Sequence, residues 1–275
     1  MPPTPRPAAA PHPPVAFGTA PPEELADLAV DAITQEIFLA PKPGLLDPRA
    51  HAPTSAAFRS LAGTGDLLRE AFLDAAEAGA DIGRLDAACR RAQGAVPQVA
   101  SDDGLDRASR VLCLLVAGCA HGADGVTDAC RLALDLGREV EPTGALAHDY
   151  PLSTAEKEAC LRLTQVLLPT LAAARSRGVA EETVQLDALL TYISWLEDDR
   201  VLREHGPLAL RMIQRDAAAV LAAGGTGSTD GRHLLRDMDE SARHYGIRPA
   251  GSGALLPALL FLGLMTPPQN LERAA

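Results

Sequence analysis

The sequence predicts an all-α fold, organised as a single-domain multi-helix bundle. Alanine and leucine dominate the 275 residues and aromatic residues make up only 3%, a composition that favours helices over strands. Apolar residues recur at helical spacing along most of the chain, and no alternating strand pattern or repeat of fixed period is evident. A chain of this length buries a sizeable core.

The composition also predicts where the folded domain begins and ends. Residues 1–22 are rich in proline and alanine, which is typical of a disordered tail that cannot bury enough apolar surface to fold. We therefore expect one helical domain over residues 23–266, followed by a short C-terminal tail over residues 267–275.

Five helical stretches are expected in the first half of the chain. Glu23 and Glu24 open the first of them, at the end of a helix where the dipole favours acids. The second stretch is one helix, or two helices broken near Gly63–Gly65. The fourth is apolar on every side, which predicts a central helix buried on most faces. The stretches cover residues 23–37, 58–79, 85–99, 111–120 and 126–136.

The second half of the chain begins with its least regular interior segment, residues 142–151, which is suited to a lid or hinge. Ser153 and Glu156 form a capping box that predicts a helix start. Pro169 is expected to bend or interrupt that helix before Gly178. Further helices are predicted at residues 186–196, 207–223, 230–245 and 253–265.

The bulk numbers exclude several classes of protein. A formal net charge of −11 argues against a general nucleic-acid or anionic-membrane binder, because these need a basic surface. The longest apolar runs, 111–120 and 255–265, are shorter than the about 20 residues that span a bilayer, and residues 1–20 lack the apolar core of a secretory signal. We expect a cytoplasmic protein. The five cysteines show no C-x-x-C spacing, so reduced core thiols are favoured over a zinc site.

The most distinctive stretch is residues 36–51, where an apolar helical pattern is interrupted by two prolines around Lys42. Only Lys42 and Lys157 are lysines in a chain that otherwise uses arginine. Pro41 and Pro43 restrict the backbone to a stiff bend, which presents a compact ammonium suited to a phosphate. The alternative is a helix-ending Pro-Gly turn with a solvated lysine, and the spacing alone leaves both open.

This stretch resembles the opening motif of the triphosphoribosyl-dephospho-CoA synthase family, Glu-x-x-x-x-Pro-Lys-Pro-Gly-Leu-x-Asp followed by a small residue and His. The resemblance implies a transferase that moves the triphosphoribosyl unit of ATP to the 2′-hydroxyl of dephospho-CoA and releases adenine. It also implies catalytic roles for Glu36, Asp47 and His51 and a phosphate-binding role for Lys42. The Asp-Met that follows the His in the family is Ala52-Pro53 here.

A second candidate site is the charged segment 196–206, in which an acidic triplet is followed by Arg200 and Arg203. Clustered carboxylates can hold Mg²⁺ together with substrate phosphates, and the alternative is a solvated charged turn. The segment resembles the family motif that begins Asp-Thr-Asn, with Asp199 and Arg200 in place of Thr and Asn. The resemblance implies that Asp198 is catalytic, that Asp198 and Asp199 bind the metal, and that the arginines bind phosphate.

The third candidate is the start of the last predicted helix, where Gly251 and Ser252 offer backbone amides and a hydroxyl to an anion. A plain N-cap by Ser252 explains the same residues. The segment resembles the family's Ser-Pro-Gly-Gly-Ser-Ala-Asp-Leu-Leu, but Ala254 replaces the aspartate.

The central family motif, Gly-Val-Asn-Thr-His-Lys/Arg-Gly, is the most altered. The corresponding residues 103–110 lack the Asn, the His and the last Gly, although Arg107 and Arg110 remain to face an anion. A further family stretch, Gly-Ala-Arg-Gly-Glu-Ala, has no equivalent near Gly144. These departures keep two alternatives open: a diverged transferase that uses another acceptor or nucleotide, and a catalytically inactive helical nucleotide-binding protein.

The resulting hypothesis is an ATP-binding, Mg²⁺-dependent transferase whose partners are ATP and dephospho-CoA or a related acceptor. The small-residue helical surfaces are also suited to a homodimer. An exposed loop lysine contributes little to folding, so replacing Lys42 by alanine is expected to abolish turnover with little loss of stability.

Overall fold

The computed structural model describes residues 17–47, 55–97, 100, 104–140 and 166–266. These residues contain helices and loops and no strand, so the predicted all-α class is confirmed for the described part of the chain. Residues 1–16 of the predicted tail 1–22, the segment 142–151 and the capping box at Ser153 lie outside it.

Ten helices lie wholly within the described residues, and residues 166–176 are helical as well. In chain order the ten are α1 (Pro22–Phe38), α2 (Ala56–Ala62), α3 (Thr64–Ala78), α4 (Ile82–Ala95), α6 (Leu105–Ala120), α7 (Val126–Glu139), α9 (Glu181–Trp195), α10 (Asp199–Ala222), α11 (Thr229–Tyr245) and α12 (Ala250–Met265).

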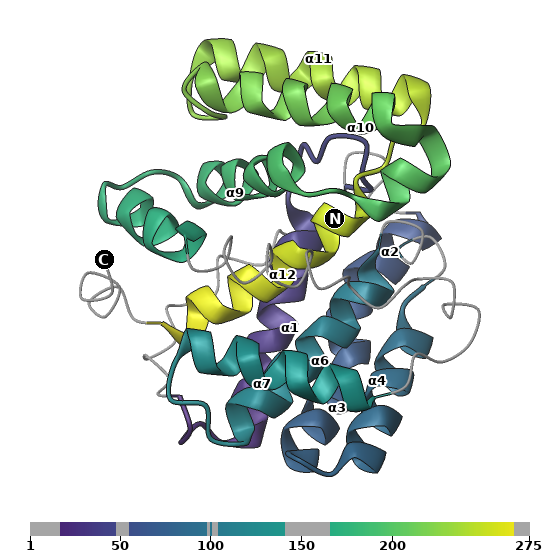
Figure 1. The fold of residues 1–275 in the computed structure, drawn as a ribbon, viewed down its shortest axis with the longest axis vertical. Helices are drawn as coiled ribbons and strands as arrows, with labels where there is room; N and C mark the ends of the chain where they lie inside the picture. The colour runs from purple at the N-terminus through teal and green to yellow at the C-terminus, as the bar shows by residue number, and fades with distance from the viewer. Residues whose placement is uncertain (1–16, 48–54, 98–99, 101–103, 141–165, 267–275) are drawn as a thin grey trace.

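Helix α12 is the central element of the bundle (Figure 1). It packs against α1, α6, α9 and α10, so helices from both halves of the chain meet on it. One side of the molecule is built from α3, α4, α6 and α7, and the other from α9, α10 and α11. Because α12 is surrounded, it is apolar on all sides and buried from Ala250 to Leu262.

Side-chain caps explain several helix starts. Ser55, Asp81 and Ser228 each accept a hydrogen bond from the backbone N–H three residues further on, which satisfies an amide that has no partner inside the helix. The predicted break near Gly63–Gly65 is confirmed, because α2 ends at Ala62 and α3 begins at Thr64.

Several helices begin earlier than the apolar pattern predicted. Helix α6 begins at Leu105 and not at residue 111, because its first turns carry polar residues that interrupt the apolar run. Helix α10 begins at Asp199, and the predicted start at residue 207 is an internal break at Gly206, whose φ of 78° only glycine adopts easily. Helix α12 begins at Ala250, so Gly251 and Ser252 lie in its first turn.

Helix α9 also starts ahead of its predicted position, at Glu181, and Pro169 does not interrupt the helical residues 166–176. Helix α4 is shifted toward the N-terminus and ends at Ala95, just before Val96 and Pro97. The remaining predicted helices agree with the structure to within a few residues at each end.

Four of the five cysteines lie in described residues, and all four are buried free thiols on α4, α6 and α7. Burial raises the pKa of Cys119 and of Cys130 to about 12, so both remain protonated at neutral pH. Within the described part of the chain, no helix combines the length and the apolar character needed to cross a bilayer.

A close helix crossing gives a test of this packing. Gly118 of α6 faces α7, where an added Cβ would lie 3.1 Å from the carbonyl oxygen of Ala129. Replacement of Gly118 by valine should therefore cost about 1–3 kcal/mol of unfolding free energy through overpacking. Denaturant unfolding measures this cost. The matched control is Gly94→Val on α4, where nothing lies within 4 Å of the new Cβ; an equal loss there would contradict the explanation.

Candidate functional site

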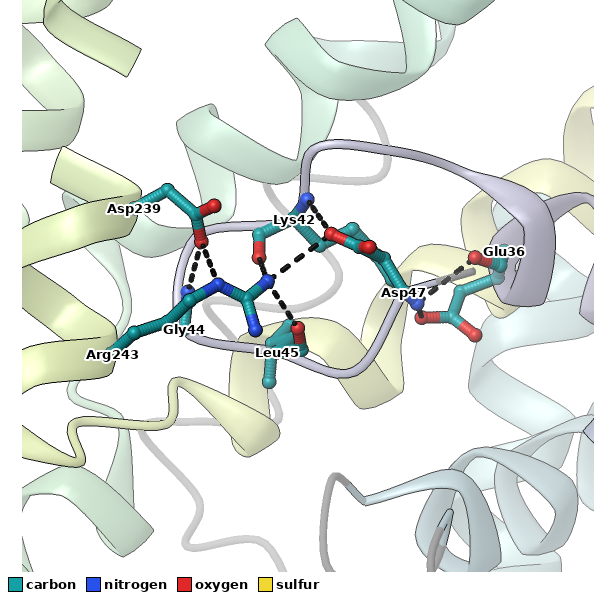
Figure 2. Close-up of polar contacts among 7 residues, drawn as sticks. All are labelled: Glu36, Lys42, Gly44, Leu45, Asp47, Asp239 and Arg243. Atoms are coloured by element: carbon teal, nitrogen blue, oxygen red, sulfur yellow. Dashed lines mark hydrogen bonds and ion pairs between the residues drawn. The ribbon is translucent and has the colours of Figure 1, made fainter. Parts of the chain in front are cut away.

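Lys42 forms a buried ion pair at the end of the first helix. Helix α1 ends at Phe38, and the loop that follows brings the Lys42 ammonium back to Glu36 (Figure 2). Its Nζ lies 2.5 Å from the Glu36 Oε1 and 3.0 Å from the Glu36 carbonyl oxygen. Only 3% of Lys42 and 6% of Glu36 is exposed. The prediction of an exposed, solvated lysine is therefore wrong, because the side chain is turned inward and binds Glu36.

Asp47 is fully buried beside the same loop. Its Oδ2 accepts hydrogen bonds from the Lys42 backbone N–H at 3.3 Å and from the Arg243 guanidinium at 3.1 Å. Arg243 and Asp239, both on α11, were not among the residues singled out in the sequence. Their only local signal is an i, i+4 charge pair on a helix, which is common on solvated surfaces, so no sequence pattern singled them out.

A small pocket opens beside the ion pair. Among the described residues that line it, Glu36 and Lys42 are the charged ones. The other lining residues are apolar side chains or glycine. The starts of two helices contribute to these walls. The start of α6 supplies Leu105, Ala108 and the preceding Gly104, and the start of α12 supplies Gly253 and Ala254. The remaining lining residues are Ile37, Leu46, Leu61 and Ala100.

The starts of α6 and α12 approach each other closely. A Cβ added to Gly104, the residue that precedes α6, would lie 2.6 Å from the carbonyl oxygen of Ala250 at the start of α12. The φ of Gly104 is 86°, a backbone conformation that independently favours glycine at this position. Glycine at this position therefore lets two helix N-termini, each with the positive end of its dipole, lie side by side next to Lys42.

Asp198 links α10 to α12. As the N-cap of α10 it accepts a hydrogen bond from the Val201 N–H at 3.3 Å. Its other oxygen accepts from the Ser252 N–H at 2.8 Å and from the Ser252 hydroxyl at 3.1 Å. The amide and hydroxyl that were predicted to cradle an anion thus bind a carboxylate of the protein itself.

Burial raises the pKa of Asp198. The hydrogen bonds from Ser252 and Val201 act in the opposite direction, and the neighbouring Asp199 adds to the rise.

Two of the predicted arginines also have carboxylate partners. Arg107 on α6 donates to Asp199 at 3.0 Å, and Arg200 donates to Glu204 at 3.0 Å within α10. The Arg107 contact joins the altered central segment to the acidic triplet, so the structure brings these two candidate regions together. His51 lies outside the described residues.

Mg²⁺ does not fit the carboxylates to which it was assigned. Both oxygens of Asp198 accept hydrogen bonds from N–H or O–H groups, and Asp199 is paired with Arg107. Within the described ranges, no group of three or more His, Cys, Asp and Glu side chains is arranged to hold a metal ion. The assignment of Asp198 and Asp199 as ligands rests on the resemblance alone, and the contacts that these carboxylates make do not support it.

Comparison with known proteins identifies the family. The family model described as "CitG: ATP:dephospho-CoA triphosphoribosyl transferase" matches residues 88–273. A probable 2-(5''-triphosphoribosyl)-3'-dephosphocoenzyme-A synthase of Pseudomonas paraeruginosa is 34% identical over 264 residues, which cover 87% of this chain and 90% of that protein. The chain belongs to this family.

Other triphosphoribosyl-dephospho-CoA synthases agree with the assignment. Proteins described in the same words are 34% identical over 263 residues in Pseudomonas fluorescens and 32% identical over 270 residues in Azotobacter vinelandii. These alignments cover 87% and 89% of this chain and 91% and 92% of the relatives, respectively. No solved structure matches the chain at a significant level. The predicted family and transferase activity are thus confirmed by family membership, whereas the residue roles are not tested by it.

The Lys42–Glu36 pair of this synthase gives a second prediction. Removal of one partner leaves the other charge buried and uncompensated, so Lys42→Met or Glu36→Leu alone should cost about 3–5 kcal/mol of unfolding free energy. The double variant replaces both charges by apolar groups and should lie much closer to the wild type. A double-mutant cycle in denaturant unfolding measures the coupling. Additive single losses would contradict a coupled buried pair.

Asp198 gives a prediction about pH. Its folded-state pKa is raised, so the folded protein binds the proton more tightly than the unfolded chain does. The stabilising contribution is therefore fully present below the ordinary aspartate pKa and is lost as the pH rises through the raised one. The difference in unfolding free energy between the wild type and Asp198→Asn should fall across that window. Thermal or denaturant unfolding at a series of pH values measures this difference. A difference that grows with pH would contradict the prediction.

Proposed function

We propose that this chain transfers the triphosphoribosyl unit of ATP to the 2′-hydroxyl of dephospho-CoA, with release of adenine, at the pocket beside Lys42 and Glu36. One observation carries the proposal. The buried ion pair contributes the charged groups of the described pocket wall, and it lies next to the first turns of α6 and α12. Helix N-termini attract anions, and a chain of net charge −11 needs such a local site for anionic substrates.

In this proposal Glu36 is the general base. The acceptor hydroxyl forms a bond to C1′ of the ATP ribose while the bond from C1′ to N9 of adenine breaks. The hydroxyl proton passes to the Glu36 carboxylate, and the electron pair of the broken bond leaves with adenine, which takes up a proton from solvent. Proton transfer by a positioned carboxylate typically contributes about 10²–10⁴-fold to the rate.

Lys42 orients that base. Its ammonium holds Glu36 through both the carboxylate and the main-chain carbonyl, and its positive charge lies beside the pocket in which the triphosphate binds. Asp47 and Asp198 act indirectly, because their carboxylates accept hydrogen bonds that fix the Lys42 loop and the start of α12. The predicted phosphate contacts remain Arg107, Arg200 and Arg203. The predicted anion site still includes Gly251, and the predicted proton carrier remains His51.

A second acceptor is the competing hypothesis, and a specific observation favours it. The first turn of α6 lines the pocket through Leu105 and Ala108, and this turn is the segment that departs from the family's Asn-Thr-His motif. A changed wall at this position predicts a changed contact with a substrate. Mg²⁺ dependence, a homodimer and a cytoplasmic location also remain predictions from the sequence.

The purified protein with ATP and Mg²⁺, with and without dephospho-CoA, tests the proposal. Free adenine is followed by chromatography and the acceptor product by mass. We expect adenine only when dephospho-CoA is present, together with a triphosphoribosyl gain in mass. Adenine release that needs a different acceptor would favour the competing hypothesis. No adenine with any acceptor would favour the non-catalytic nucleotide-binding alternative.

Glu36→Gln in the same assay tests the assigned base. The amide keeps the size of the side chain but accepts no proton, so turnover should fall by about 10²–10⁴-fold. Circular dichroism confirms that the variant is folded. The matched control is Glu240→Gln, since Glu240 is an exposed residue of α11 and its replacement should leave turnover unchanged. Normal turnover by Glu36→Gln would remove Glu36 from the proton transfer.

A further inference from the structure

The loop that carries Lys42 is held by α11 and not only by its own helix. The Arg243 Nη2 donates to the Leu45 carbonyl at 3.0 Å, to the Asp47 Oδ2 at 3.1 Å and, more distantly, to the Lys42 carbonyl at 3.5 Å (Figure 2). One guanidinium nitrogen therefore contacts both ends of the loop. Arginine suits this task because its planar fork is rigid and always charged.

Asp239 completes the contact from the preceding turn of α11. One of its oxygens accepts from the Arg243 Nε at 2.9 Å and from the Gly44 backbone N–H at 3.0 Å. Asp239 thus orients the guanidinium and binds the middle of the loop at the same time. The loop also lies too close to the end of α11 for a side chain at Gly44, where an added Cβ would lie 2.2 Å from the carbonyl oxygen of Ile247, just after α11, and 3.0 Å from the Cβ of Ala242.

These contacts act on the ion pair through the backbone. Arg243 is absent from the lining of the pocket, and 38% of its side chain is exposed to solvent. The Lys42 backbone is fixed by Asp47 and Arg243, and its ammonium at the far end of the side chain is bound to Glu36. A displaced loop therefore moves Lys42 relative to Glu36.

We propose that Arg243, oriented by Asp239, is a positioning residue that holds Lys42 against Glu36 for triphosphoribosyl transfer. The inference rests on the proposed function, and it adds a residue of α11 to the reaction that contacts no reacting atom. Displacements of about 1 Å in a catalytic arrangement can cost about 10²-fold in rate, so the contribution of Arg243 should appear in kcat.

Arg243→Ala is the central variant. We expect its kcat to fall by about 10–100-fold while the KM for ATP changes by less than about threefold, because Arg243 lies outside the pocket. Guanidinium at millimolar concentration should restore part of the kcat, since the vacated position is open to solvent. Arg236→Ala is the matched control, because Arg236 is an exposed arginine of the same helix. A kcat equal to that of the control would overturn the inference, as would loss of activity that guanidinium leaves unchanged.

Lysine labelling gives a readout that does not depend on turnover. The chain contains only Lys42 and Lys157, so an amine-modifying reagent followed by peptide mass analysis reports Lys42 with Lys157 as an internal reference. The buried Lys42 should react slowly in the wild type and in Arg236→Ala, and about tenfold faster or more in Arg243→Ala, which corresponds to the loss of about 1.4 kcal/mol of protection. Equal labelling in all three proteins would overturn the inference.

The two assays separate the two proposals. A wild type that releases no adenine would refute the proposed function, and the labelling would still decide whether Arg243 holds Lys42. An active wild type with unchanged labelling in Arg243→Ala would refute the inference alone.

Discussion

The buried Lys42–Glu36 ion pair is the constraint on which the arrangement of the site depends. Two charges removed from water carry a desolvation penalty of several kcal/mol each, which only close geometry and additional hydrogen bonds offset. The Glu36 carboxylate and carbonyl both bind the ammonium, so α1 must end at a fixed point and the loop must return at a fixed angle. The hydrogen bonds from α11 to Gly44, Leu45 and Asp47 hold that angle. The pair therefore requires a neighbouring helix that is distant in sequence.

The other buried acids follow the same rule, and this determines what they contribute to the site. Asp47 and Asp198 are buried almost completely, and each accepts hydrogen bonds from backbone N–H groups and from a side chain. A carboxylate held in this way is well placed to fix loops and helix starts, but its lone pairs are directed at the protein. Glu36 differs because it reaches the pocket wall. Contact with the pocket therefore distinguishes the proposed base from acids that the sequence motifs place on an equal footing.

The sequence predicted what local chemistry determines. Helical spacing predicted most helices, and the Pro-Lys-Pro-Gly stretch pointed to the candidate site because prolines restrict the backbone wherever they occur. The burial of Lys42 was not predictable, since the same residues are typical of an exposed helix-ending turn. Arg243 was not predictable either, because its contact spans the chain from residue 42 to residue 243 and its local pattern is that of a solvated helix. The early start of α6 was missed since Asp106, Arg107 and Arg110 interrupt its apolar pattern.

The pairing of the arginines restricts how an anionic substrate can bind. Arg107 and Arg200 are already neutralised by Asp199 and Glu204, so a phosphate that takes either arginine must displace a carboxylate, and the gain is only the difference between the two pairs. At the start of α12 the Ser252 amide and hydroxyl are likewise already bound to the Asp198 carboxylate, whereas the partial charges at the N-terminus of α6 belong to the backbone. Under the proposed function, the start of α6 and Lys42 would therefore attract the triphosphate, and the paired arginines would act mainly on selectivity. Such a division would let an acidic protein bind an anion without a basic surface.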